Sequence, residues 1–390
     1  MTHGTGRGTD RQRERDPVVT ASSVSGRSAP ENGRSAPGRG RSAPGNDRSA
    51  PTLPRPRGPL SAGVIGALKG DRAALPALSP EVSGPGPDPY GQDLQLALYV
   101  LYELHYRGFA GVDDDNEWDP SLLRLRGAAE RRFLSALRSD VPDGRGVDDA
   151  LAALLVEPPG HDEHGVSHFL QRKGELWHLR EYAALRSLYH LKEADPHAWV
   201  IPRLRGRAKA AMVAVEYDEF GAGRAENIHA RLFADLMADL GLDTTYGRYL
   251  DAGPAAALAT VNLMSLLGLH RSLRGALAGH FATVEITSSP ASRRLARAMR
   301  RTGAGPAAQR FYDEHVEADA VHEQVVRRDV IGGLLTDEPH LAPDIVFGIA
   351  ATTLLEEQLA RHLLSAWHAG VTSLRVPLDA RGEHLADGGP

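Results

Sequence analysis

The stretch His315-Val316-Glu317-Ala318-Asp319-Ala320-Val321-His322 decides the fold that this chain is expected to adopt. Side chains spaced by three, four and seven residues share one face of an α-helix, so this spacing predicts that His315, Asp319 and His322 point the same way. A His-x-x-x-acid-x-x-His triple is expected only about 0.1 times by chance in a chain of this composition. Small and apolar residues flank the triple, which is typical of a helix face turned toward the interior.

A second acid–histidine pair occurs earlier in the chain, in Glu226-Asn227-Ile228-His229. Helix bundles hold a carboxylate-bridged metal pair with a Glu from each of two helices and a Glu-x-x-His pair from each of two others. The pair alone is weak evidence, since about two such pairs are expected by chance, and Glu175-Leu176-Trp177-His178 has the same pattern. Pair and triple together favour a metal centre over the alternative, a surface run of acids and imidazoles.

Three further glutamates are candidate ligands. Glu285 lies in the otherwise apolar stretch from Phe281 to Ile286, where an ionised carboxylate needs a partner. Glu219 comes seven residues before Glu226, on nearly the same helix face, and Glu193 comes at the end of its predicted helix. The chain has no cysteine, so imidazole and carboxylate must hold any metal. More candidate ligands than zinc's usual four favour a dinuclear iron or manganese site.

The chain is expected to consist of a tail, a helical domain and a second tail. Arg-Ser-Ala-Pro occurs four times with a period of seven between Arg27 and Pro51, and proline in each repeat excludes a coiled coil. We therefore expect residues 1–85 to be a disordered, low-complexity tail. Apolar residues then recur at helical spacing without the alternation of a sheet, which predicts an all-α domain over residues 86–372. The polar residues 373–390 are expected to form a C-terminal tail.

Two helix boundaries follow from local signals. The stretch from Ile201 to Leu240 is expected to be helical throughout and to end at Gly241. Thr287-Ser288-Ser289-Pro290 is expected to stop one helix and to cap the next.

Composition narrows the classes of partner. A net charge of −5 gives no strong attraction to nucleic acid or to an anionic membrane. The sequence contains no run of about 18 apolar residues and no secretory signal at its start. The absence of cysteine fits a cytosolic protein. We therefore expect a cytoplasmic protein that acts on a small molecule and binds neither nucleic acid nor membrane. The sequence leaves open whether the chain forms a homodimer.

The chain resembles the haem-oxygenase-like di-iron oxidases and oxygenases, the superfamily of iron-containing redox enzymes. The resemblance runs over roughly residues 90–370 and does not include the Arg-Ser-Ala-Pro tail. Four stretches carry it: Leu191 to His197, Asp218 to Arg224, His229 to Phe233, and Asp313 to His322. It implies a haem-oxygenase-like helical bundle that holds two irons.

The resemblance also implies a ligand set in two halves. One half is a Glu followed by Glu-x-x-His, which falls on Glu193, Glu226 and His229. The other is a Glu followed by the triple, which falls on Glu285, His315, Asp319 and His322. Some members that oxygenate nitrogen carry an additional Glu, and Glu219 matches it. The pair Glu175 and His178 has no counterpart, so we expect it to be structural.

The implied activity is that of a non-haem di-iron oxidase or oxygenase, an iron-dependent oxidoreductase. Two Fe(2+) ions per chain and O2 as co-substrate would oxidise a small organic molecule, by amine N-oxygenation or by oxidative C–C cleavage. Two alternatives stay open on the same residues. One is a haem-binding or haem-degrading protein on the same fold, and the other is a non-catalytic helical scaffold that binds iron.

Overall fold

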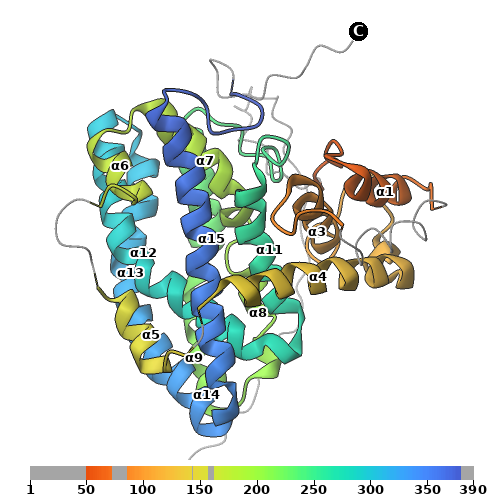
Figure 1. The fold of residues 1–390 in the computed structure, drawn as a ribbon. Helices are drawn as coiled ribbons and strands as arrows, with labels where there is room; N and C mark the ends of the chain where they lie inside the picture. Colours follow the sequence, from red (N-terminus) through yellow and green to blue (C-terminus); the bar gives the residue numbers. More distant parts are fainter. Residues whose placement is uncertain (1–49, 73–85, 143, 157–161, 379–390) are drawn as a thin grey trace, which may run out of the picture. The chain divides into compact units, whose positions relative to one another are not determined.

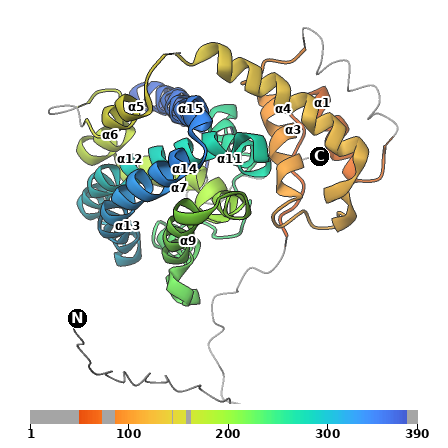
Figure 2. The same ribbon diagram turned by 90° about the horizontal axis from the view of Figure 1, so that it is seen from below.

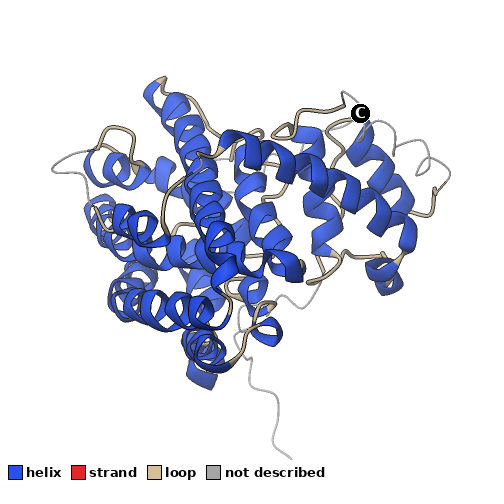
Figure 3. Ribbon diagram, turned by 60° about the horizontal axis from the view of Figure 1, so that its bottom comes forward, coloured by secondary structure: helices blue, strands red, loops and turns tan. Residues whose placement is uncertain are grey.

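The computed structural model describes residues 50–72, 86–142, 144–156 and 162–378. Most of the Arg-Ser-Ala-Pro tail and the end of the C-terminal tail, residues 1–49 and 379–390, lie outside these ranges, so their predicted disorder stays a prediction. Within the described ranges the secondary structure is helical and no β-strand forms (Figure 3). The all-α prediction is therefore confirmed.

The segment 50–72 is folded, which corrects the expectation that the whole of 1–85 is a disordered tail. Helix α1 (Pro59–Leu68) packs on α3 (Gln92–Glu103) and buries Leu60, Val64 and Ile65. The Asp93 carboxylate accepts hydrogen bonds from the first backbone N–H groups of α1, at 2.7 and 2.9 Å. Burial of apolar side chains and this helix cap both stabilise α1 in a folded position. The boundary of the folded domain therefore lies N-terminal to α1.

The remaining α-helices, with one π-helix after α13, follow in chain order. They are α4 (Pro120–Asp140), α5 (Val147–Leu154), α6 (Val166–Arg172), α7 (Leu176–His190), α8 (Asp195–Ala198), α9 (Gly206–Glu219), α10 (His229–Asp239), α11 (Ala255–Leu269), α12 (Arg274–Thr302), α13 (Pro306–Val325), the π-helix η6 (Val326–Ile331), α14 (Gly332–Asp337) and α15 (Ala342–His368). Figure 1 shows α12, α13 and α15 side by side. Figures 1 and 2 both place α11 between the α12–α13 pair and α3. No helix among the described residues combines the length and the apolar character that crossing a membrane requires.

Helix α12 runs unbroken through Pro290, which contradicts the predicted stop at residues 287–290. Proline removes one N–H donor from the helix, a cost that a helix accepts when its neighbours hold it in place. Here α13 and α15 both pack along α12, and the Ser289 hydroxyl donates to the Val316 carbonyl of α13 at 3.2 Å. Tertiary packing has overridden the local stop signal.

Two glycines allow α12 and α15 to approach closely. A Cβ on Gly348 would lie 2.7 Å from the carbonyl carbon of Ala276 and nearer still to its oxygen. A Cβ on Gly279 would lie 2.9 Å from the carbonyl carbon of Ile345. Real Cβ atoms essentially never come this close to a backbone, so glycine is required at both positions.

A buried ion pair links α3 to the residues that follow α7. Lys192 Nζ lies 2.9 Å from Glu103 Oε2, and the two side chains are 1% and 0% exposed. The Tyr246 hydroxyl donates to the same carboxylate at 2.7 Å. Lys192 Nζ also lies 4.2 Å from the centre of the Tyr106 ring, a cation–π contact. The residue after Lys192 is Glu193, so this network fixes the backbone that carries a candidate ligand.

Candidate metal centre

Seven buried side chains form two groups of four that share one member. The first is Glu193, Glu219, His229 and His315, and the second is Glu219, Glu285, Asp319 and His322. Within each group one donor atom per residue lies within 4.8 Å of the others. Glu219 is the shared residue. All of its companions in the second group, and His315 in the first, come from α12 and α13.

The triple lies on the face of α13 that its spacing predicts. His315, Asp319 and His322 are buried, whereas Glu317 between them is exposed. Glu285 lies in the middle of α12, on the helix that packs most extensively against α13. The helix register assumed from the sequence is therefore the observed one.

Glu226 is not part of either group. It is exposed in the short 3-10 segment η4 (Ala225–Asn227), and α10 begins only at His229. Helix α9 ends at Glu219, and Gly221 and Gly223 follow with φ of 73° and 79°, a left-handed conformation that favours glycine. The chain turns there, and because Glu226 lies outside α10, residues 226 and 229 share no helix face.

Glu219 takes the place beside His229 that was predicted for Glu226. Its Oε2 atom lies 2.6 Å from His229 Nδ1, although the two atoms are not in hydrogen-bond geometry. The sequence did contain the signal, since two glycines that follow Glu219 within about one helical turn mark a helix end. The other predicted ligands, Glu193 and Glu285 among them, are brought together as expected.

The His315 ring is oriented by its own helix. Its Nδ1 atom lies 2.7 Å from the carbonyl oxygen of Phe311, which can only accept, so Nδ1 carries the proton. Its other nitrogen, Nε2, faces the cluster, 3.9 Å from Glu193 Oε1. This is the arrangement by which proteins fix the tautomer of a metal-binding histidine.

The His322 ring uses its nitrogens in the opposite sense. Nδ1 faces the cluster, 3.2 Å from Glu285 Oε2 and 3.6 Å from Glu219 Oε1. Nε2 lies 3.3 Å from Asp218 Oδ2, on a carboxylate that is 56% exposed. Asp218 was missed from the sequence because its position next to Glu219 gives no pattern of its own.

His190 is a second residue near the cluster that was missed from the sequence. Its Nδ1 atom lies 2.7 Å from Glu193 Oε1, and its ring packs at 4.7 Å from the Phe233 ring. The spacing His190-x-x-Glu193 is the available signal, because residues three apart lie on one helix face. His178, by contrast, is structural as expected: its Nδ1 accepts the Glu175 backbone N–H at 2.9 Å and caps α7.

The donor atoms fit a metal. Four buried atoms of the cluster have no hydrogen-bond partner among the described residues: Glu193 Oε2, His229 Nδ1, His315 Nε2 and Asp319 Oδ2. Leaving a buried polar atom unpaired costs about 1–3 kcal/mol, so four in one place call for an occupant. Carboxylate and imidazole donors suit divalent iron, manganese or zinc.

The pKa values show how the cluster balances its charge without a metal. Burial, followed by the charges of Glu219 and Asp319, raises the pKa of Glu285 to about 8. Burial raises the pKa of Asp319 to about 6. Burial opposes protonation of His315, but its contacts with Glu193 outweigh this and raise its pKa to about 10. The metal-free cluster thus retains protons that divalent cations would displace.

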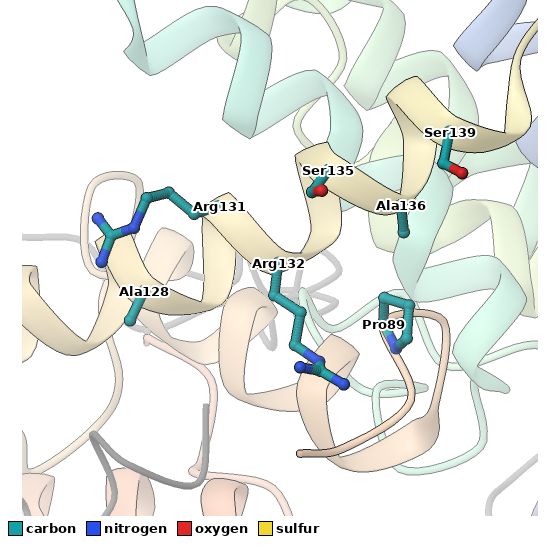
Figure 4. A pocket seen from close by; sticks show the side chains of 7 residues that line it. All are labelled: Pro89, Ala128, Arg131, Arg132, Ser135, Ala136 and Ser139. Atoms are coloured by element: carbon teal, nitrogen blue, oxygen red, sulfur yellow. The ribbon is translucent and has the colours of Figure 1, made fainter. Parts of the chain in front are cut away.

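A small cavity of about 20 Å³ adjoins the cluster. Five cluster residues line it, and the rest of its wall is Tyr189, Ala194, His197, Phe281, Val284 and Ser288. This volume holds about one water-sized group. A larger surface pocket of about 490 Å³ lies along α4 beside Pro89, where Arg131 and Arg132 extend from the helix (Figure 4). That pocket contains no carboxylate or imidazole and does not resemble a metal site.

Residues 180–357 match the model of a family described as iron-containing redox enzyme. That segment contains every residue of the cluster, and the resemblance stated from the sequence is confirmed. A particular relative is the nitrosourea synthase of Streptomyces achromogenes subsp. streptozoticus, 26% identical over 170 residues. The match covers 43% of this chain and 36% of the relative, so it extends over about a third of that protein's length. Family and relative together support an iron-dependent oxidoreductase.

Proposed function

We propose that this protein is a non-haem di-iron oxygenase or oxidase, which binds two Fe(2+) ions per chain and uses O2 to oxidise a small organic substrate. The observation that carries the proposal is the sharing of Glu219 between two buried groups of four donors. A single four-coordinate ion would leave three of the seven side chains without a role. A carboxylate common to two groups is what a carboxylate-bridged metal pair requires.

Between the two reaction types considered from the sequence, we favour oxygenation at nitrogen. The similar relative is named for the synthesis of a nitrosourea, a product with an oxidised nitrogen. The name of this relative favours an amine, amide or urea nitrogen over a carbon–carbon bond as the site of attack.

Ferrous iron, when bound, would supply the electrons that activate O2, and the protein supplies its surroundings. The Phe311 carbonyl and Asp218 orient His315 and His322. His190 orients Glu193. The apolar side chains of Phe281 and Val284 limit the cavity to about one small group and exclude bulk water.

Anaerobic reconstitution with Fe(2+) tests the proposal, with Glu219→Ala and Glu226→Ala as a matched pair. Both variants remove one glutamate from the same region of the chain, but only Glu219 lies in the cluster. Wild type and Glu226→Ala should each bind about two irons per chain, whereas Glu219→Ala should lose iron from both positions. Wild type that saturates at one iron or prefers zinc, or two variants that behave alike, would refute the shared-ligand site.

Absorption spectra of the iron-loaded protein exposed to O2 separate the proposal from its alternatives. A Soret band after incubation with haem would favour the haem-binding alternative. Iron uptake without any O2 consumption over a panel of amines, amides and ureas would favour the non-catalytic scaffold. The di-iron proposal expects O2 consumption that depends on one of these substrates and that His315→Ala abolishes.

A further inference from the structure

Two buried histidines beside the cluster have no part in ligation. His197 lies on α8 and His280 on α12, and each is 1% exposed. Their Nε2 atoms lie 3.1 Å apart. The Nδ1 atom of His280 lies 2.8 Å from the Thr352 hydroxyl on α15. The three side chains thus form a hydrogen-bonded row that leads from α15 through α12 to the cavity wall.

The proton positions in this row follow from its far end. The Thr352 hydroxyl donates to the Gly348 carbonyl at 2.7 Å, so its oxygen accepts from His280 Nδ1–H. Burial holds the pKa of His280 well below its usual range and lowers that of His197 to about 4, so both rings are neutral. A neutral His280 with a proton on Nδ1 has a bare Nε2. His197 must therefore donate from Nε2–H, which leaves its own Nδ1 as an unprotonated acceptor.

The row is held in place at both ends by backbone contacts. Thr352 comes one turn after Gly348, where α15 touches α12 too closely for any side chain. His197 follows Pro196, and a Cβ on Gly268 of α11 would lie 3.5 Å from the Pro196 carbonyl carbon and nearer still to its oxygen. Such contacts leave the two imidazoles little freedom to turn, so the direction of the row is built into the fold.

His197 lines the small cavity together with Glu193 and Glu219. Its Nε2 atom is taken by His280, so Nδ1 is the ring nitrogen left for a molecule in the cavity. The carboxylates on the same wall also accept hydrogen bonds, and Phe281 and Val284 offer none. A group that enters this space meets these acceptors, the Tyr189 and Ser288 hydroxyl groups, the His315 ring and apolar surface.

We propose that His197 binds the substrate as a hydrogen-bond acceptor, and that Nδ1 receives the N–H or O–H of the group to be oxidised. His280 and Thr352 are positioning residues, because they act through His197 by fixing its tautomer. This inference rests on the proposed function for the identity of the cavity as the substrate site. It narrows the substrate to molecules whose reactive atom carries a hydrogen, such as a primary or secondary amine or a urea nitrogen.

Nitrogen-15 NMR of the metal-free full chain tests the tautomers without any iron chemistry. Signals are assigned by their loss in His197→Gln and His280→Gln. We expect His280 to carry its proton on Nδ1 and His197 on Nε2. Thr352→Val should disturb both signals, and Thr352→Ser should restore them. A proton on Nδ1 of His197 would reverse the row and overturn the proposal.

Two small probes of equal shape test the acceptor itself. Methylurea carries N–H donors, and its terminal NH2 is about the size of the one group that the cavity holds, so only that end needs to enter. Methyl acetate has the same number of non-hydrogen atoms but no donor. Methylurea should shift the His197 Nδ1 signal and methyl acetate should not. The affinity of the protein for methylurea should fall about tenfold in His197→Phe, as expected for the loss of one hydrogen bond, and should recover in His197→Gln. Equal responses to the two probes, or no response to methylurea, would refute the proposal.

Iron analysis of the same variants distinguishes the two levels of inference. His197→Phe should still bind as much iron as wild type, because His197 belongs to neither donor group. If wild type binds iron poorly while the tautomers and the probe shifts are as expected, the di-iron proposal fails and the acceptor stands. If iron binds in full and the probes do not respond, the acceptor alone fails.

Discussion

Replacement of Gly348 by alanine should force α12 and α15 apart. The new Cβ would lie 2.7 Å from the carbonyl carbon of Ala276, whereas ordinary contacts begin at 3.4 Å. The helices must therefore separate by at least about 0.7 Å at this crossing. The same movement stretches the 2.8 Å bond between His280 and Thr352 to about 3.5 Å, where a hydrogen bond is essentially lost. Overpacking and the lost bond together should cost about 2–4 kcal/mol.

Thermal unfolding of the metal-free protein measures this cost. A loss of this size should lower the midpoint temperature by about 3–6 °C in a chain of this length. Gly66→Ala is the matched control, because Gly66 lies within α1 and a Cβ added there would have no atom within 4 Å. That variant should be neutral or more stable by up to about 1 kcal/mol. If Gly348→Ala unfolds at the wild-type temperature, the close helix contact does not constrain the protein as argued.

Three further predictions concern stability. Ile65→Ala should lower the free energy of unfolding in denaturant by about 2–4 kcal/mol, since Ile65 is 2% exposed. An unchanged midpoint would mean that α1 does not belong to the folded domain. Glu216→Gln should stabilise the metal-free protein. Both carboxylate oxygens of Glu216 are buried without a hydrogen-bond partner, and burial raises the pKa of Glu216 well above its usual range. A variant less stable than wild type would contradict this. The metal-free protein should also lose stability between about pH 6.5 and about pH 10. His315 and His322, with pKa values raised to about 10 and about 9, contribute stability below about 6.5 that disappears as the pH rises through those values. Melting curves across this range check the sign, and rising stability would refute it.

Helical periodicity in the sequence was enough to predict the all-α fold and the face formed by His315, Asp319 and His322. These are local properties, since the spacing of side chains on a helix depends on the helix alone. Helix α1 was missed although Leu60, Val64 and Leu68 recur at four-residue spacing. The surrounding proline and glycine suggested a tail, and only the packing of α1 on α3 outweighs that composition.

Helical periodicity could not predict which of Glu219 and Glu226 lies in the cluster. A continuous helix would have put both on nearly one face, and the outcome depends on where α9 ends. Pro290 was misjudged for the opposite reason, since α12 continues where local signals predict a stop. The His197–His280–Thr352 row joins residues from three separate helices, and no local pattern reports contacts at that sequence distance.

The ion pair between Lys192 and Glu103 limits how far the part of this chain that carries the cluster can be separated from the rest. The family segment begins at residue 180 and ends inside α15, whereas Glu103 belongs to α3. A chain cut down to that segment would leave the Lys192 ammonium group, which is 1% exposed and one residue from Glu193, without its carboxylate partner. Removing one partner of a buried ion pair lowers the free energy of unfolding by about 3–5 kcal/mol. The segment therefore is a unit of sequence similarity but not a unit of folding. Transplanting this site into another helical protein would require carrying along a helix that lies outside the family segment.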